Sequence, residues 1–256
     1  MLLLNKFYTT SINLDDIFGL YSFVRKIKSG FVIKNTFDTT MSRLVLKSDI
    51  AMQNLTIPNC GGESLVTESI SIELMTSLFG ATNFVTERQV QYKYQCKKID
   101  FLCIVDGEQI GVSVSRSAQY KELTDENGEY TPVIAYRQIR KKLDGLLAAR
   151  AGITPAHSYD RSVLHIFCEN NFIANLLINA FPQAAKDMQV EDEISLLITI
   201  CGNRKLYDDD LSIFGDIIRP TPTNLKKIGL IYHTNGNSRK VRNSGLTLHP
   251  SLSKVF

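Results

Sequence analysis

The chain has 256 residues, 44% of them hydrophobic and 21% charged, which is ordinary for a globular protein with one large core. No apolar run approaches the roughly 18 residues that a membrane span requires, so we expect no membrane contact. The start, MLLLNKFYTTSIN, lacks the basic segment and the cleavage site of a secretory signal, although a mitochondrial leader stays possible.

The five cysteines form no CxxC pair, and three of them lie in or at the ends of expected strands: Cys103, Cys168 and Cys201. Cysteine in such a position usually acts as a small buried hydrophobe. We therefore expect an intracellular, reducing compartment, either cytoplasm or nucleus, and no zinc site.

The net charge of +3 is unevenly distributed. From Ile217 to Phe256 the chain has seven basic residues and no acidic one, whereas the rest has 22 basic and 26 acidic residues. A basic tail on a mildly acidic body predicts a polyanionic partner, nucleic acid first. A solvated tail without a ligand is the alternative, and a protein partner is also possible.

In chain order, the first recognisable elements are a short helix over residues 14–30, closed by Gly30, and a strand at FVIKNTF. The loop IPNCGGES then leads to a helix over residues 64–79, for which Ser64 is the expected N-cap and Gly80 the end. Its apolar residues recur at i, i+4 spacing: Val66, Ile70, Leu74 and Leu78.

Three strands are predicted next, at residues 85–95, 98–105 and 109–116. The first alternates apolar and polar residues, and the second is a continuous apolar run. Asp106 and Gly107 form a tight hairpin turn into the third strand. That strand has two faces, one with Ile110, Val112 and Val114 and the other with Gly111, Ser113 and Ser115.

An amphipathic helix over residues 133–150 follows, with an apolar stripe on one side and a cluster of cations on the other: Arg137, Arg140, Lys141 and Lys142. Strands at 162–168 and 194–201 flank a further helix at NFIANLLINAF. We expect His165, which alternates with apolar neighbours, to be a hydrogen-bonded core residue.

Helix–strand alternation after an antiparallel hairpin predicts an α/β fold with a mixed central sheet flanked by helices. We divide the chain into an N-terminal extension over residues 1–60 and a core over residues 61–203. A C-terminal extension with the basic tail then covers residues 204–256.

The element order, together with KKIDF at residues 97–101 and GVSVS at residues 111–115, resembles the PD-(D/E)XK nuclease-like superfamily over about residues 62–202. The resemblance implies a restriction-endonuclease-like core whose acidic side chains hold Mg²⁺ for phosphodiester hydrolysis. Asp100 matches the aspartate of that pattern. We prefer Glu68 over Glu73 as the acid on the preceding helix, so the expected metal ligands are Asp100 and Glu68.

The chain departs from the superfamily pattern on the strand after the hairpin turn. Ser113 stands where the superfamily has an acid, and Ser115 stands where it has a lysine. A hydroxyl is a poor Mg²⁺ ligand beside a carboxylate, and serine cannot replace an ammonium charge. Arg116 follows directly, but strand alternation places it on the face opposite Ser115. Purely structural roles for Asp100 at a strand entry and for Glu68 in a first helical turn stay open.

The expected nucleic-acid contacts are cations of the hairpin strand, of the helix over residues 133–150 and of the tail: Arg116, Arg137, Arg140, Lys141, Lys226, Lys227, Arg239, Lys240 and Arg242. The first functional hypothesis is a nucleic-acid-binding, nuclease-like domain with weakened or lost catalysis. The second is an active metal-dependent nuclease that uses Asp100, a helix glutamate and Glu87. The third is a structural subunit that keeps the fold as a scaffold.

Overall fold

The computed structural model describes residues 1–4, 8–39, 44–56, 64–118, 124–126, 128–208 and 210–217, which all belong to one compact unit, Met1–Arg219. The elements in chain order are β1 (Leu2–Leu4), β2 (Thr9–Ile12), α1 (Leu14–Val24), β3 (Val32–Asp38), α2 (Asp49–Asn54), α3 (Leu65–Phe79), β4 (Thr82–Thr86), β5 (Phe101–Val105), β6 (Glu108–Ser117), α4 (Pro132–Gly152), η2 (Pro155–His157), β7 (Arg161–Cys168), α5 (Asn171–Asp187), β8 (Ile194–Ile200), α6 (Arg204–Tyr207) and η3 (Leu211–Ile217).

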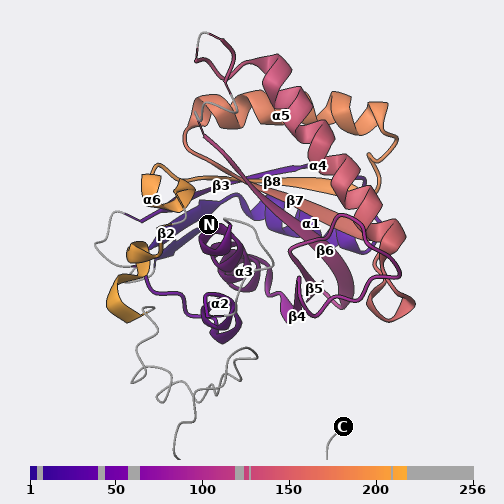
Figure 1. Ribbon diagram of the computed structural model, residues 1–256, viewed down its shortest axis with the longest axis horizontal. Coiled ribbons are helices and arrows are strands. Elements are labelled where there is room, and N and C mark those ends of the chain that lie inside the picture. Colours follow the sequence, from indigo (N-terminus) through magenta and orange to yellow (C-terminus); the bar gives the residue numbers. More distant parts are fainter. Residues whose placement is uncertain are drawn as a thin grey trace, which may run out of the picture. The chain divides into compact units, whose positions relative to one another are not determined.

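The strands form one sheet in the order β1-β2-β3-β8-β7-β6-β5-β4. The four central strands, β3, β8, β7 and β6, are parallel to one another, and every other pair of neighbouring strands is antiparallel. Helices α4 and α5 cover one face, and α2 and α3 lie on the other (Figure 1). The expected α/β fold with a mixed sheet flanked by helices is therefore confirmed.

Strand β7 shows how the alternation of side chains builds two cores. Val163 and Phe167 are buried in the cluster under α3, whereas Leu164 and Ile166 are buried in the cluster under α4 and α5. Side chains of a strand point alternately to opposite faces, so a strand covered on both faces is apolar throughout. This explains why SVLHIFC is apolar at most of its positions.

His165 of β7 is the polar exception, and it is fully buried. Its Nε2 lies 2.7 Å from Thr199 Oγ1, which donates its only hydrogen to Asn35 Oδ1 at 2.6 Å, so Nε2 carries the proton. Nδ1, 2.7 Å from Ser71 Oγ, then accepts from that hydroxyl. Burial lowers the pKa of His165 to about 3, so the imidazole is neutral. The expected core role of His165 is confirmed.

The predicted strand over residues 85–95 is wrong in most of its length. Strand β4 ends at Thr86, whose amide donates to Gln89 Oε1 at 2.9 Å and whose carbonyl accepts from the amides of Gln89 and Val90. The chain therefore turns away from the sheet at this point. Val90 is nevertheless buried, and Tyr92 is half-buried with its hydroxyl accepting from the amide of Ile99, whereas Tyr94 is exposed. The residues whose alternation suggested a strand therefore lie in a loop that buries only part of them.

Gly30 has a different role from the expected helix end. Helix α1 stops at Val24, and the chain reverses through Lys26, whose φ is +62°. The amide of Gly30 donates to the Glu191 carbonyl at 2.6 Å, and a Cβ on Gly30 would lie 2.0 Å from the Ile194 carbonyl oxygen. Glycine is required here because two backbone segments approach each other closely.

The terminal segments are continuous with the core. Strand β3 pairs in parallel with β8, so residues 1–60 supply strands to the same sheet as residues 61–203 and are not a separate extension. At the other end, Leu206 and Tyr207 of α6 and Phe214 of η3 are buried in the cluster under α3. The helix and turn after residue 203 therefore belong to the core as well.

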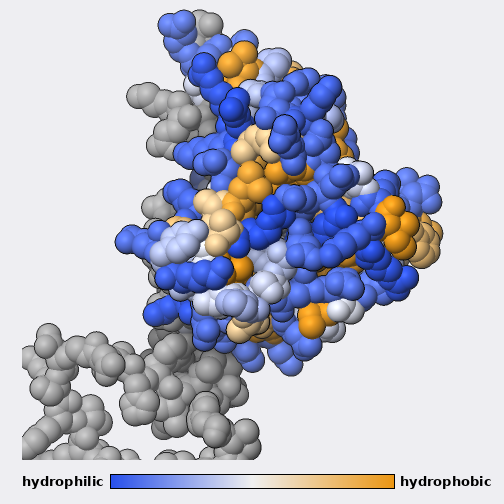
Figure 2. All heavy atoms as spheres, turned by 90° about the vertical axis from the view of Figure 1, so that its right-hand side faces the viewer, coloured by the Kyte–Doolittle hydropathy of each residue, from blue (hydrophilic) through white to orange (hydrophobic). Residues whose placement is uncertain are grey.

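The surface and the cysteines agree with the composition. Hydrophilic residues predominate on the face drawn in Figure 2, where hydrophobic ones form small groups and a short diagonal band. Within the described residues, no helix has the length and apolar character needed to traverse a lipid bilayer. Cys103, Cys168 and Cys201 are buried free thiols, as expected of small hydrophobes at strand positions.

Candidate functional site

A cleft of about 750 Å³ opens between the β5–β6 hairpin and α4. Its lining comes from the start of α3, the segment before β5, β6, the loop before α4 and one side of α4: Ser64, Lys98, Asp100, Ser113, Val114, Ser115, Arg116, Thr124, Ile134, Arg137, Gln138, Lys141 and Lys142. The cleft thus gathers six of the residues that the sequence singled out, namely Asp100, Ser113, Ser115, Arg116, Arg137 and Lys141.

Asp100 is held by the hairpin. Its amide donates to the Val112 carbonyl at 3.0 Å, and its Oδ2 accepts from the amide of Val114 at 2.6 Å. Since Phe101 pairs with Val112, Asp100 lies across from Ser113 on the neighbouring strand. Burial raises the pKa of Asp100, and the Val114 amide and then the Lys142 ammonium oppose that rise.

Glu68 comes from the first turn of α3 and is only 7% exposed. Burial, followed by the charge of Asp100, raises the pKa of Glu68 to about 8, so the carboxyl keeps a proton at neutral pH. Ser64 stands at the N-cap position as expected, but its hydroxyl donates to the Glu68 carboxyl and makes no capping bond. The structure therefore brings Glu68 close to Asp100, which lines the cleft together with Ser64.

Glu73, the other glutamate considered, belongs to the fold. Its Oε1 accepts from the Tyr8 hydroxyl at 2.5 Å, and its Oε2 accepts from the amides of Lys47 and Ser48 at 3.0 and 2.8 Å. These bonds tie α3 to the chain before α2 and occupy both carboxylate oxygens. The preference for Glu68 as the partner of Asp100 thus agrees with the geometry.

The carboxyl groups of Glu68 and Asp100 are the side chains that would hold a divalent cation here. Mg²⁺ binds through one or two carboxylates and otherwise keeps its water ligands, so the donor set fits such an ion. There it would polarise a phosphoryl oxygen or activate a water. In the part of the chain that the structure describes, however, no three His, Cys, Asp or Glu side chains are grouped closely enough to enclose a metal. The neutral Ser113 adds no third carboxylate.

Four cations of the cleft have no hydrogen-bond or ion-pair partner among the residues that the structure describes. Lys98, Arg137, Lys141 and Lys142 make no hydrogen bond or ion pair with any other described residue. Elsewhere the basic side chains are often neutralised, as in the ion pairs Arg25–Asp106, Lys26–Asp160, Arg150–Glu193 and Arg204–Glu169. The cleft therefore concentrates positive charge that no acidic side chain cancels by direct contact.

Lys98 was missed as a site residue, and Lys142 was considered only as one cation of the 137–142 helix face, although periodicity contains a signal for both. Lys98 precedes Asp100 by two positions, the spacing that places side chains on one face of an extended chain. Lys142 follows Gln138 by four positions, just as Lys141 follows Arg137, which puts both pairs on one side of a helix.

Arg140 does not belong to the cleft, contrary to the expectation that the cations of residues 137–142 act together. Its Nη1 donates to the Tyr136 hydroxyl at 3.4 Å, and that hydroxyl donates to Asp187 of α5 at 2.5 Å. Successive residues of a helix are 100° apart, so neighbours such as Arg140 and Lys141 point in different directions. The basic face therefore divides, with Arg140 on the side of α5.

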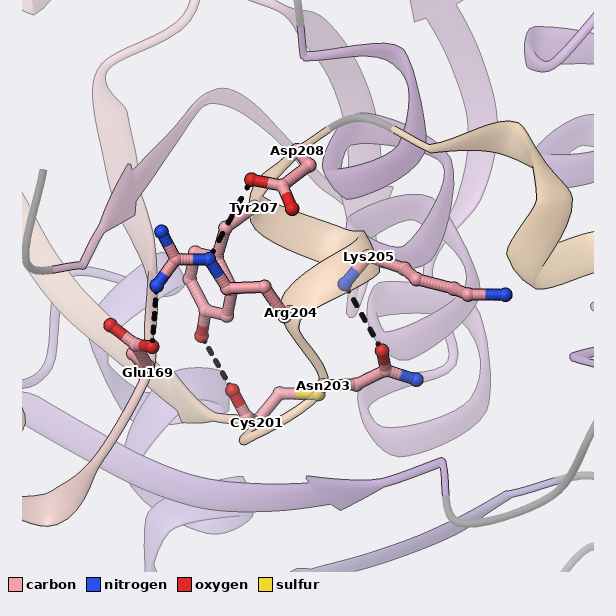
Figure 3. A network of polar contacts seen from close by, with 7 residues as sticks. All are labelled: Glu169, Cys201, Asn203, Arg204, Lys205, Tyr207 and Asp208. Atoms are coloured by element: carbon pink, nitrogen blue, oxygen red, sulfur yellow. Dashed lines mark hydrogen bonds and ion pairs between the residues drawn. The ribbon is translucent and has the colours of Figure 1, made fainter.

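Arg116 lines the cleft but is anchored to the protein. Its Nη1 donates to the Tyr207 carbonyl of α6 at 2.7 Å. Figure 3 shows how α6 is held at the ends of β7 and β8: the Tyr207 hydroxyl donates to the Cys201 carbonyl at 2.7 Å, and Arg204 pairs with Glu169 at 3.0 Å. The guanidinium of Arg116 is thus fixed in place at one end of the cleft.

The remaining predicted nucleic-acid contacts belong to the tail and lie outside the described residues: Lys226, Lys227, Arg239, Lys240 and Arg242.

Comparisons with known proteins give one limited similarity. No protein-family model and no solved structure matches the chain. A curated protein of Dictyostelium discoideum, named AAC-rich mRNA clone AAC4 protein, is 26% identical over 156 residues, which make up 59% of this chain and 23% of that protein. The match thus spans less than a quarter of the relative's length, and the relative's name states no activity.

Proposed function

We propose that the chain binds nucleic acid in the cleft between β6 and α4, as a nuclease-like domain in which phosphodiester cleavage is weakened or lost. The observation that carries the proposal is a set of four cleft cations that pair with no other residue in the described ranges: Lys98, Arg137, Lys141 and Lys142. Lysine and arginine side chains that neutralise phosphates supply most of the affinity of proteins for nucleic acids.

The spacing of the cations favours a polymer over a single small anion. Arg137 and Lys141 lie one helical turn apart on α4, and Lys98 approaches from the segment before β5. Charges spread over a helix and a separate segment suit a chain of phosphates, each of which meets a different cation. The acid-free tail from Ile217 onward adds a second positive segment in the sequence.

The neutral positions on β6 support weakened or lost catalysis. Ser113 and Ser115 line the cleft beside Asp100, where a third carboxylate and an ammonium group would assist hydrolysis in the family that the sequence resembles. Glu68 keeps a proton at neutral pH, so the acidic pair carries less negative charge with which to attract a metal ion. A cleft of this kind binds phosphates better than it cleaves them.

The test is a binding titration with fluorescent single- and double-stranded DNA and RNA oligonucleotides, followed by anisotropy in EDTA at several salt concentrations. The critical pair of variants is Lys141→Glu and Arg140→Glu, because these neighbours are both exposed and basic but only Lys141 lines the cleft. We expect Lys141→Glu to weaken binding by about 10-fold or more and Arg140→Glu by less than about 2-fold.

Equal effects of the two substitutions would contradict binding in the cleft. Absence of binding by the intact protein to every oligonucleotide at about 50 mM salt would refute the nucleic-acid function altogether. The hypothesis of a scaffold subunit would then take precedence.

A second candidate function, metal-dependent cleavage, is favoured by the meeting of Glu68 and Asp100 and by the nearby ammonium of Lys142. Incubation of the same oligonucleotides with Mg²⁺ or Mn²⁺ distinguishes the two. We expect negligible cleavage. Robust cleavage that Asp100→Asn abolishes would establish an active nuclease instead.

A further inference from the structure

Lys142 is the cation most closely associated with the acidic end of the cleft. It lies on α4 one turn after Gln138, lines the cleft and is half-buried. Its ammonium is the cation that opposes the rise in the pKa of Asp100, and the charge of Asp100 acts in return on Lys142. The hairpin and α4 therefore bring a carboxylate and an ammonium group to the lining of the same cleft.

The ammonium of Lys142 is nevertheless not tied down. Among the described residues it makes no hydrogen bond and no ion pair, while Asp100 is satisfied by the amide of Val114. Partial burial of a charge without a direct partner costs stability, and burial accordingly lowers the pKa of Lys142. A cation kept in this condition is available to an anionic ligand.

The acidic pair creates a difficulty for any phosphate that enters the cleft. A phosphate near Asp100 is repelled by its carboxylate, and the adjacent positions on β6, Ser113 and Ser115, provide no positive charge to offset the repulsion. Lys98, Arg137 and Lys141 also line the cleft, but Lys142 is the cation whose charge contributes most to lowering the pKa of Asp100.

We propose that Lys142 binds the nucleic-acid phosphate that lies over Asp100, and that α4 thereby supplies the positive charge that β6 lacks at Ser115. This inference rests on the proposed function and specifies which contact makes the acidic end of the cleft accessible to a phosphodiester. It makes Lys142 more important for affinity than the outer cations of the same helix.

The test compares Lys142→Gln with Lys142→Arg in the full chain, using the fluorescent oligonucleotides and a salt titration in EDTA. Gln preserves much of the side-chain length without the charge, whereas Arg retains the charge. We expect Gln to weaken binding by about 10- to 100-fold, the effect of losing one charge-assisted hydrogen bond, and Arg to stay within about 3-fold of the wild type. Lys186→Gln, on the exposed side of α5, is the matched control and should bind like the wild type.

The salt dependence separates a phosphate contact from a structural effect. If Lys142 contacts one phosphate, Lys142→Gln should reduce the slope of log affinity against log salt by about 0.9 for duplex DNA. A loss of affinity with an unchanged slope, or an equal loss in the Arg and Gln variants, would overturn the inference.

Failure of the inference can be told apart from failure of the proposed function. If the wild type binds and Lys141→Glu weakens it but Lys142→Gln binds normally, nucleic-acid binding in the cleft stands and the role of Lys142 is refuted. If the wild type binds none of the oligonucleotides, both are refuted together.

Discussion

The buried glutamate of the cleft allows a quantitative prediction for the substitution Glu68→Gln. Glu68 has a pKa of about 8 in the folded protein, compared with 4.5 for an exposed glutamate. Each pH unit between these values corresponds to about 1.4 kcal/mol, so the pH-dependent loss of stability reaches at most about 5 kcal/mol. The folded state binds the extra proton, so the contribution of Glu68 to stability is most favourable below pH 4.5 and is lost as the pH rises towards 8.

Glutamine removes the titration and can still accept the hydrogen bond from Ser64. We expect the Glu68→Gln variant to match the wild type within about 1 kcal/mol at pH 5 and to exceed its stability by about 2 kcal/mol or more at pH 8. The expected difference is smaller than the maximum of about 5 kcal/mol, because Asp100 interacts with Glu68 and the two carboxyl groups titrate together.

Urea unfolding followed by far-UV circular dichroism measures this difference, since the chain contains no tryptophan for fluorescence. Glu73→Gln is the matched control in the same helix. Its carboxylate accepts hydrogen bonds from Tyr8, Lys47 and Ser48, so losing one acceptor should destabilise the fold at both pH values. A Glu68→Gln variant that is less stable at both pH values, or whose difference from the wild type does not change with pH, would refute the reasoning.

Three further outcomes are expected. His165→Leu should lower the free energy of unfolding in urea by about 2–4 kcal/mol, because two buried hydroxyls lose their hydrogen-bond partner. The wild type should lose stability as the pH falls from 6.5 towards 3, because only its unfolded state protonates this histidine, and the variant should lack that pH dependence. Gly30→Ala should lower the melting temperature markedly, since its Cβ would lie 2.0 Å from the Ile194 carbonyl oxygen; an unchanged value would contradict the close approach. Asp100→Asn should tighten oligonucleotide binding in EDTA several-fold by removing a charge that repels phosphate, and weaker binding by a folded variant would count against that view.

The amino-acid sequence by itself determined the elements whose signal is local. The apolar residues at i, i+4 spacing and Gly80 predicted α3 within a residue of its observed bounds. The turn at Asp106 and Gly107, both with φ in the left-handed region, predicted the hairpin of β5 and β6. These features depend on neighbours in the chain, so a window of a few residues contains the necessary information.

The pairing of distant segments was decided only by the tertiary structure. Nothing in FVIKNTF indicates that β3 lies beside β8, about 160 residues later, because any exposed strand edge offers the same backbone donors and acceptors. Likewise, the alternation at Val90 and Tyr92 satisfied a strand pattern, although both residues lie in a loop that packs Val90 fully and Tyr92 partly against the core under α4. Burial produces the pattern whether or not a ladder of hydrogen bonds forms.

The candidate site, too, was indicated in part by the sequence and decided in part by the tertiary structure. The sequence pointed to Asp100 and Glu68 separately, and the cation cluster of residues 137–142 was visible as a run of charges. Only the orientation of α4 on the sheet decided that Lys141 and Lys142 line the cleft while Arg140 turns to Tyr136 and α5. A helix can be rotated about its axis without any change in its sequence, so packing against the strands determines which charges reach the ligand.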